Sequence, residues 1–343
     1  MAECVHGVYQ EIDWLHFLFI FVHMLSGCEK IAPCARFSTD VRHQGYTIPA
    51  NIMARAAQTG KDHMLPSYLA DTNLSSIKLV ATDMDLTLLA DDKSMPEGID
   101  ERIDALTRHG VVFCAASGRP EPTLRSAFPL HHQDMAFVAD NGAAVYLRGE
   151  AVYRDLLDKG LYHEVLDRCV SSGHGAPVLC SFDEAYMLER DREHHDMVSI
   201  YYHSITYVDS FDSVDVDSNK VSMYFPGWDS MRNFEELYNP EFGSRLYVTC
   251  AGNEWIDFMN LGINKGSGIR HLAEALDIDV ADIAAFGDTY NDIPMLETVG
   301  HSYVMGNAAE HMHEHGKFLA PTNNEAGVLT VIDRIVTTMD GTA

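Results

Sequence analysis

Positively charged residues are scarce in this chain, in which 24 Lys and Arg stand against 51 Asp and Glu, for a formal net charge of −27. So acidic a surface repels the phosphate backbone of nucleic acids at long range, and we expect no nucleic-acid partner. A protein of this charge that binds an anion must concentrate its positive charge locally. We expect a metal ion and a few placed Lys or Arg side chains to supply it.

Paired cysteines are also missing. The seven cysteines include no C-x-x-C pair and follow no fixed spacing, so neither a structural zinc site nor a disulfide framework is indicated. This usage fits a reducing compartment, and we expect a cytoplasmic protein. Cys114 and Cys250 lie inside apolar runs and are interpreted as small core residues.

No apolar run reaches the length of about 20 residues that a membrane span needs, and we expect no membrane partner. The most hydrophobic stretch, residues 14–28, is shorter than that, and no Lys or Arg precedes it as in a secretion signal. Residues 25–28 (LSGC) do resemble a bacterial lipoprotein cleavage box, and that alternative stays open.

Residues 29–75 show no sustained period of 2 or 3.6 and are interrupted by Pro and Gly. We interpret residues 1–75 as a poorly ordered N-terminal extension. An upstream start codon would also explain it, with Met64 as the alternative start of the chain.

From residue 77 onward, short apolar runs alternate with amphipathic segments. The pattern predicts strands at 77–82, 111–116, 135–139, 283–286 and 302–305, and helices at 99–109, 266–276, 292–299 and 327–338. Such alternation implies an α/β fold with a Rossmann-like, doubly wound parallel sheet. Ligands bind beyond the carboxyl ends of the strands in such sheets, so we expect the functional site there.

Residues 153–252 differ in composition from the alternating segments on either side, because they are richer in aromatic residues and His. The pattern predicts strands at 197–207, 220–225 and 244–250, and helices at 157–171 and 230–238. We interpret this segment as an inserted α+β cap domain. It divides the core into two parts, residues 76–152 and 253–343.

Four acidic side chains follow two of the core strands: Asp83 and Asp85 after the first, and Asp288 and Asp292 after strand 283–286. Two acids at positions i and i+2 point in different directions, so one can attack phosphorus while the other moves a proton. Four carboxylates brought together would raise one another's pKa values unless a cation neutralised them. Mg²⁺ suits such oxygen ligands and leaves room for a substrate phosphate.

Candidate donors to a phosphoryl group lie at other strand ends and helix starts. They are Ser117, the backbone amides around Gly118, and Lys265, which precedes the predicted helix 266–276. The Lys265 ammonium and the free backbone amides of the helix N-terminus would bind the same anion. Neutralising the phosphoryl oxygens is essential for hydrolysis of a phosphate monoester, so these donors complement the acids.

With these acids and donors taken together, the sequence resembles the haloacid dehalogenase superfamily, specifically its Cof-like branch. The D-x-D-x-T pattern at residues 83–87 is similar to the first motif, Ser117 to the second, Lys265 to the third, and the pattern G-D-x-x-N-D at residues 287–292 to the fourth. The resemblance runs from about residue 77 to the C-terminus. It includes the tail patterns MGNA at 305–308 and NNEAGV at 323–328.

The resemblance implies a role for each matching position. Asp83 would become the aspartyl-phosphate, and Asp85 would protonate the leaving oxygen and then activate water. Mg²⁺ would be held by the Asp83 carboxylate, the Asp85 backbone carbonyl and Asp288, with Asp292 supporting its waters. Ser117 and Lys265 would hold the phosphoryl group, with Asn291 nearby.

Motif spacing also places the cap. About 30 residues separate Asp85 from Ser117, whereas roughly 150 separate Ser117 from Lys265. The insertion therefore resembles a C2-type cap, of the C2B kind. Such a cap closes over the site and selects the leaving group.

Several other residues allow two interpretations. Lys220 also precedes an apolar run and competes with Lys265 for the third motif, although it falls within the presumed cap. Arg119 and Asn141 are candidate substrate contacts, but Asn-Gly is also a common turn. His311, His313 and His315 resemble a metal-binding tract, for which a solvated helix edge is the simpler explanation. Residues 201–203 (YYH) are interpreted as a cap strand whose aromatic side chains line the substrate cavity.

The sequence therefore predicts a Mg²⁺-dependent phosphatase acting on a small phosphorylated metabolite, a sugar phosphate or a phosphorylated cofactor. A phosphomutase shares the covalent intermediate and is an alternative. A catalytically silent, sugar-phosphate-binding regulatory module is another, against which the intact acids argue. Nothing in the sequence indicates an oligomeric state.

Overall fold

The computed structural model describes residues 65–341, which belong to one compact unit of the chain. The apolar stretch 14–28 and the lipoprotein-like residues 25–28 lie outside the described residues, as does Met64. Among the residues described, no helix has both the length and the apolarity needed to cross a membrane.

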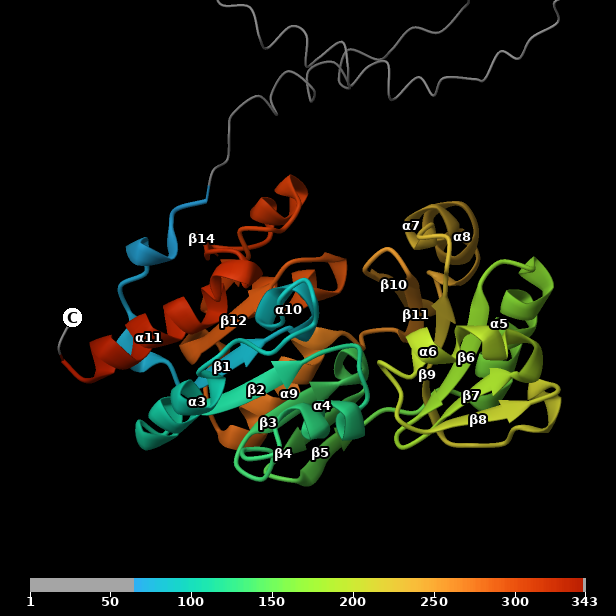
Figure 1. Ribbon diagram of the computed structural model, residues 1–343, viewed down its shortest axis with the longest axis horizontal. Helices are drawn as coiled ribbons and strands as arrows, with labels where there is room; N and C mark the ends of the chain where they lie inside the picture. Colours follow the sequence, from blue (N-terminus) through green and yellow to red (C-terminus); the bar gives the residue numbers. More distant parts are fainter. Residues whose placement is uncertain (1–64, 342–343) are drawn as a thin grey trace, which may run out of the picture. The chain divides into compact units, whose positions relative to one another are not determined.

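The core is built on an eight-stranded sheet in the order β14-β13-β12-β1-β2-β3-β4-β5. Neighbouring strands from β14 to β3 are parallel, whereas β4 and β5 form an antiparallel edge (Figure 1). The strands are β1 (Leu79–Thr82), β2 (Val112–Ala116), β3 (Ala136–Ala139), β4 (Ala144–Leu147), β5 (Glu150–Arg154), β12 (Ile283–Gly287), β13 (His301–Val304) and β14 (Phe318–Leu319).

Helices cover both faces of this sheet because its strands are apolar on both sides. Val80 of β1 packs into the cluster that includes α3 (Ile99–Arg108) and α11 (Gly327–Met339). Its neighbours Leu79 and Ala81 point to the opposite face, into the cluster with α9 (Lys265–Leu276) and α10 (Ile293–Thr298). The short helix α4 (Glu121–Ala127) follows β2.

The cap has a sheet of its own, with six strands in the order β10-β11-β9-β6-β7-β8. Its strands are β6 (Ala176–Ser181), β7 (Ala185–Leu188), β8 (Ile205–Val208), β9 (Ser218–Tyr224), β10 (Leu246–Ala251) and β11 (Trp255–Asn260). Its helices are α5 (Lys159–Ser172), α6 (His195–Val198), α7 (Ser230–Asn233) and α8 (Asn239–Phe242). The predicted fold class, a Rossmann-like core with an inserted α+β cap, is confirmed.

The observed cap boundaries differ from the predicted limits of 153 and 252. Strand β5 runs past residue 153 and still pairs with β4 of the core, whereas β11 pairs with β10 and β9 of the cap. Gly252, with φ of +72°, lies in the turn between β10 and β11. The turn glycine thus marks a hairpin rather than the return to the core, and the cap spans residues 155–260.

The predicted strand at 197–207 is also wrong over most of its length. Helix α6 occupies the beginning of this segment, and only β8 at its end pairs with another strand. Tyr202 instead lies outside the sheet and packs in a buried cluster with Trp255.

The last ten residues of the predicted extension belong to the core. Tyr68–Ala70 and Leu74–Ser76 form single helical turns, and Leu74 is buried in the main cluster. The Asp71 carboxylate accepts hydrogen bonds from His301 at 2.8 Å and from Tyr303 at 2.7 Å. The sequence missed this segment because single turns give no period to detect.

Candidate active site

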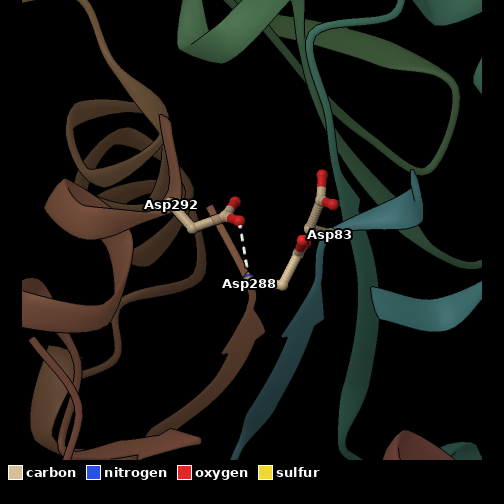
Figure 2. Close-up of side chains that lie close together, drawn as sticks. All are labelled: Asp83, Asp288 and Asp292. Carbon is tan, nitrogen blue, oxygen red and sulfur yellow. Dashed lines mark hydrogen bonds between the residues drawn. The ribbon is translucent and has the colours of Figure 1, made fainter. Parts of the chain in front are cut away.

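The acidic residues meet at the carboxyl ends of β1 and β12, two adjacent strands of the core sheet. Asp83 directly follows β1, Asp288 directly follows β12, and Asp292 lies in the turn after it. Figure 2 shows the three side chains turned toward a common space. One carboxylate oxygen from each lies within 4.8 Å of the others, and all three residues are buried.

Lys265 completes this cluster from the first position of α9. Its side chain is fully buried, and its Nζ donates to Asp83 Oδ1 at 2.5 Å and to Asp292 Oδ1 at 2.6 Å. Asn264 caps the helix by accepting from the amide of Ser267, which fixes where Lys265 begins. Lys265 therefore lies at a helix start, as predicted, and in contact with two of the acids; its predicted contact with the phosphoryl group stays a prediction.

Further hydrogen bonds fix the orientation of the acids. Asp292 Oδ2 accepts from the backbone amides of Asp288 and Thr289, at 3.0 and 3.1 Å. Asp288 Oδ1 accepts from the hydroxyl of Thr87 at 2.8 Å. The threonine that ends the D-x-D-x-T pattern thus positions an acid of the other motif.

The electrostatics of the cluster call for an additional cation. Burial raises the pKa of Asp83 to about 7, with the charges of Asp292 and Asp85 adding to the shift and Lys265 opposing it. Burial and the neighbouring Asp292 and Asp83 also raise the pKa of Asp288. If all three buried carboxylates were ionised, they would share one ammonium, and two negative charges would lack compensation. The oxygen ligands and the charge fit a divalent ion such as Mg²⁺.

Asp85 lies outside the expected cluster of four carboxylates. Its side chain is not part of the cluster of three, because it accepts from Arg119 at 2.6 and 3.0 Å and from Lys93 at 2.8 Å. Burial alone would raise the pKa of Asp85, but the two cations outweigh it and hold the pKa below its usual value. The metal contact expected of Asp85 through its backbone carbonyl stays a prediction.

Arg119 pairs with Asp85, and its predicted contact with substrate stays a prediction. Its guanidinium is bidentate to Asp85 and also lies over the ring of Tyr201, 5.1 Å from the centroid. Lys93 carries no recognisable signal in the sequence. It lies in the loop after the first motif, and its spacing in the sequence does not indicate that its side chain contacts Asp85.

The predicted phosphate-binding residues gather beside the acids. Ser117 and Gly118 follow β2, the other neighbour of β1, and Ser117 is almost completely buried. Asn291 Nδ2 donates to Asn141 Oδ1 at 3.0 Å. Asn141 itself is buried, with φ of +53°, so the Asn-Gly sequence is both a turn and a part of the site.

A cavity of about 240 Å³ adjoins this cluster and extends beneath the cap. Asp83, Ser117 and Asn291 are among its core residues. Among its cap residues, the aromatic or charged ones are Tyr201, Tyr202, Lys220, Glu254, Trp255 and Asp257. Of these, the sequence singled out Tyr201 and Tyr202 as candidate cavity residues and Lys220 as a rival of Lys265. Trp255 and Asp257 were missed because they had been assigned to the core.

The histidines of the C-terminal half do not form a metal site within the described part of the chain. His311 stacks on Tyr290, with ring centroids 4.5 Å apart, and His315 pairs with Glu297 at 2.7 Å. The only cluster of potential metal ligands in residues 65–341 is that of Asp83, Asp288 and Asp292.

Comparison with known proteins shows the family to which the chain belongs. The haloacid dehalogenase-like hydrolase family matches residues 80–332, and the chain belongs to this superfamily, in its Cof-like branch. An Escherichia coli (strain K12) 5-amino-6-(5-phospho-D-ribitylamino)uracil phosphatase is 32% identical over 263 residues, which cover 76% of this chain and 97% of that protein. The protein is accordingly a phosphatase.

Solved structures share the fold. A protein from Streptococcus mutans UA159 superposes with a TM-score of 0.71 at 25% identity, covering 76% of this chain and 99% of that one. A sugar phosphatase of haloacid dehalogenase subclass IIB superposes with a TM-score of 0.66 at 18% identity, covering 75% and 98% of the two chains.

Proposed function

We propose that the protein is a Mg²⁺-dependent phosphatase that hydrolyses a small phosphorylated metabolite through an aspartyl-phosphate on Asp83. The observation that carries this proposal is the buried cluster of Asp83, Asp288 and Asp292 around Lys265, at the floor of a cavity. A bound Mg²⁺ would be held by Asp83, Asp288 and the Asp85 carbonyl, supported by Asp292. It would supply positive charge to the phosphoryl oxygens.

In the first half-reaction an Asp83 carboxylate oxygen bonds to phosphorus while the bond from phosphorus to the leaving oxygen breaks. Asp85, after taking up a proton from solvent, gives it to that oxygen and the alcohol departs. In the second half-reaction water attacks phosphorus and returns a proton to Asp85. The bond to Asp83 then breaks, and inorganic phosphate leaves with the carboxylate restored. Ser117 and Lys265 hold the phosphoryl oxygens throughout.

Asp85 is tied to Arg119 and Lys93 before substrate arrives. A carboxylate in such an ion pair is a poor proton donor. The phosphate of the substrate carries the same charge as this carboxylate and competes for the two cations. Binding of substrate therefore releases Asp85 for proton transfer.

The leaving group occupies the cap side of the cavity, beside Tyr201 and Trp255. Trp255 is 6% exposed, and its indole Nε1 has no hydrogen-bond partner in the described structure. A buried N–H donor next to aromatic faces suits a leaving group with a flat ring and a hydrogen-bond acceptor. This favours a phosphorylated cofactor precursor over a simple sugar phosphate, and the substrate of the Escherichia coli relative is the first to test.

Release of inorganic phosphate from a panel of phosphorylated metabolites, with Mg²⁺ and with a chelator, tests the proposal. The panel includes 5-amino-6-(5-phospho-D-ribitylamino)uracil, sugar phosphates and nucleotides. We expect Mg²⁺-dependent turnover by the wild type, none above background by Asp83→Asn, and wild-type rates for Asp333→Asn, an exposed acid of α11. Transfer of phosphate to a sugar acceptor would indicate a phosphomutase, and metabolite binding without turnover a silent module.

A further inference from the structure

Lys220 is a buried lysine of the cap that faces the core. It lies in β9, in the middle of the cap sheet, and only 1% of its side chain is exposed. Its strand neighbours Val221 and Met223 point the other way, into the apolar cluster with α5. Lys220 thus occupies the face of the cap sheet that lines the cavity, together with Asp257 of the adjacent β11.

The ammonium of Lys220 makes its shortest contact with the core. Its Nζ donates to the backbone carbonyl of Gly118 at 2.5 Å. Asp257 of the cap and Asp140 of the core each have one carboxylate oxygen 3.5 Å away. The carbonyl belongs to the residue that follows Ser117, so the position of the phosphate-binding loop depends on a cap side chain.

Asp257 makes a second connection to the core. Its Oδ1 accepts from Ser222 within the cap at 2.5 Å, while its Oδ2 accepts from Asn141 Nδ2 at 2.6 Å. Asn141 in turn holds Asn291 at 3.0 Å, between the two acids of the G-D-x-x-N-D motif. A continuous row of hydrogen bonds therefore leads from the cap sheet to the loop that carries Asp288 and Asp292.

Gly118 lies close to both the core and the cap side chains at this junction. A Cβ at Gly118 would lie 3.2 Å from Asn141 Nδ2 and 3.5 Å from Asp257 Oδ2. The backbone of Asn141 is joined to the same loop, because its amide donates to the carbonyl of Ser117 at 2.9 Å. The Ser117-Gly118 loop and the Asn141 turn of the core are thus in close contact with each other and with Asp257 of the cap.

We propose that Lys220 and Asp257 are positioning residues that dock the cap onto the core and thereby set the Ser117-Gly118 loop and, through Asn141, Asn291 in their reactive places. The proposal rests on the proposed phosphatase function. It makes assembly of the phosphoryl site depend on cap docking, since two of its loops are hydrogen-bonded to the cap: Gly118 accepts from Lys220, and Asn141 donates to Asp257. Lys220 thus acts away from the acidic cluster, in a role distinct from that of Lys265.

Steady-state kinetics of Lys220→Met separates this role from substrate binding. Rates are measured with two substrates, the best metabolite of the panel and acetyl phosphate. The leaving group of acetyl phosphate is only acetate, which is too small to depend on contacts with the cap. Displaced catalytic geometry costs on the order of 10- to 100-fold in rate, so we expect kcat to fall by that factor for both substrates with KM within about threefold. A rise in KM for the metabolite alone, with kcat unchanged, would overturn the proposal and make Lys220 a leaving-group contact.

Asp257 supplies a second pair of variants in case Lys220→Met does not fold. Asp257→Asn keeps an oxygen acceptor for Asn141 and should retain at least about a third of kcat, whereas Asp257→Leu should match Lys220→Met. Lys159→Met is the matched control, because Lys159 is an exposed cap lysine whose partner Asp215 is also in the cap. Equal kcat for Asp257→Leu and the wild type would contradict the positioning role.

Hydrogen exchange gives a readout that does not need turnover. Amides of residues 117–119 and 141–142 should exchange at least about tenfold faster in Lys220→Met than in the wild type, both with inorganic phosphate present, while amides of α11 stay unchanged. Unchanged exchange in the two loops would overturn the proposal even if the protein released no phosphate from any ester. Failure of the phosphatase function and failure of the positioning role are therefore read separately.

Discussion

Lys265 Nζ lies 2.5 Å from Asp83 Oδ1, in a fully buried pair that joins the start of α9 to the end of β1. Burial alone would lower the pKa of Lys265, but the carboxylates of Asp292 and Asp83 raise it above its usual value. The lysine therefore stays charged and holds the nucleophile in place. Its ammonium also stabilises a cluster of acids that would otherwise repel one another.

Replacing Lys265 by Met should consequently cost stability as well as activity. Removing one partner of a buried ion pair leaves uncompensated charge and costs about 3 to 5 kcal/mol of unfolding free energy. We expect a loss of this size in urea denaturation of the metal-free protein at neutral pH. The double variant Lys265→Met with Asp83→Asn should recover part of it, and additive losses would contradict the coupling.

The acidic cluster should also make the stability of the metal-free protein depend on pH. Asp83 keeps its proton up to about pH 7 in the folded protein, whereas a carboxyl in the unfolded chain ionises near pH 4. The folded state binds more protons in this window, so the free energy of unfolding should fall as pH rises from about 4 to 7. The raised pKa of Asp288 acts in the same direction.

Mg²⁺ should reduce this dependence by compensating the ionised carboxylates. The measurement is the melting temperature across this pH range, with saturating Mg²⁺ and with a chelator. We expect the curves to converge at low pH and to separate by several degrees near neutrality. Curves that stay parallel across the whole range would show that the ion does not bind at these acids.

The segment before β1 should contribute to stability through Asp71. Removing its carboxylate leaves His301 and Tyr303 buried without their partner, at a cost of about 1 to 3 kcal/mol for each group. The exposed pair of Asp333 and Arg102 is a comparison, for which Asp333→Ala should cost about 0 to 1 kcal/mol. If urea denaturation gave equal losses for Asp71→Ala and Asp333→Ala, the proposed importance of the segment would be wrong.

The cap side of the cavity should select the leaving group through Trp255. We expect Trp255→Leu to raise KM about tenfold for the best ring-containing phosphate ester, because aromatic contact and one hydrogen bond are lost. KM for a sugar phosphate should change less than threefold. An equal change for both substrates would assign Trp255 a packing role in its cluster with Tyr201 and Tyr224.

The core of the site was predictable because its signals are local. Asp83, Ser117 and Asp288 each directly follow an apolar strand, and parallel strands bring their carboxyl ends to one edge. Lys265 was predictable in the same way, from a helix start. The structure places all four together, within a few residues of the predicted element ends.

The cap contributions were not predictable in this way. Lys220, Trp255 and Asp257 reach the site because two separate sheets face each other, and no spacing within the sequence encodes that relation. The ion pairs of Asp85 with Arg119 and Lys93 were missed for a similar reason. A charged side chain in a loop has several partners within reach, and only the folded backbone decides among them.

Covalent phosphorylation of Asp83 is the most direct test of the central claim. The wild type is mixed with Mg²⁺ and the best substrate of the panel, stopped in acid within milliseconds, and analysed by peptide mass spectrometry. We predict one added phosphoryl group on the peptide that contains Asp83, absent from Asp83→Asn and absent after chelation. Phosphate release at the wild-type rate by Asp83→Asn, or equal turnover after chelation, would contradict the mechanism.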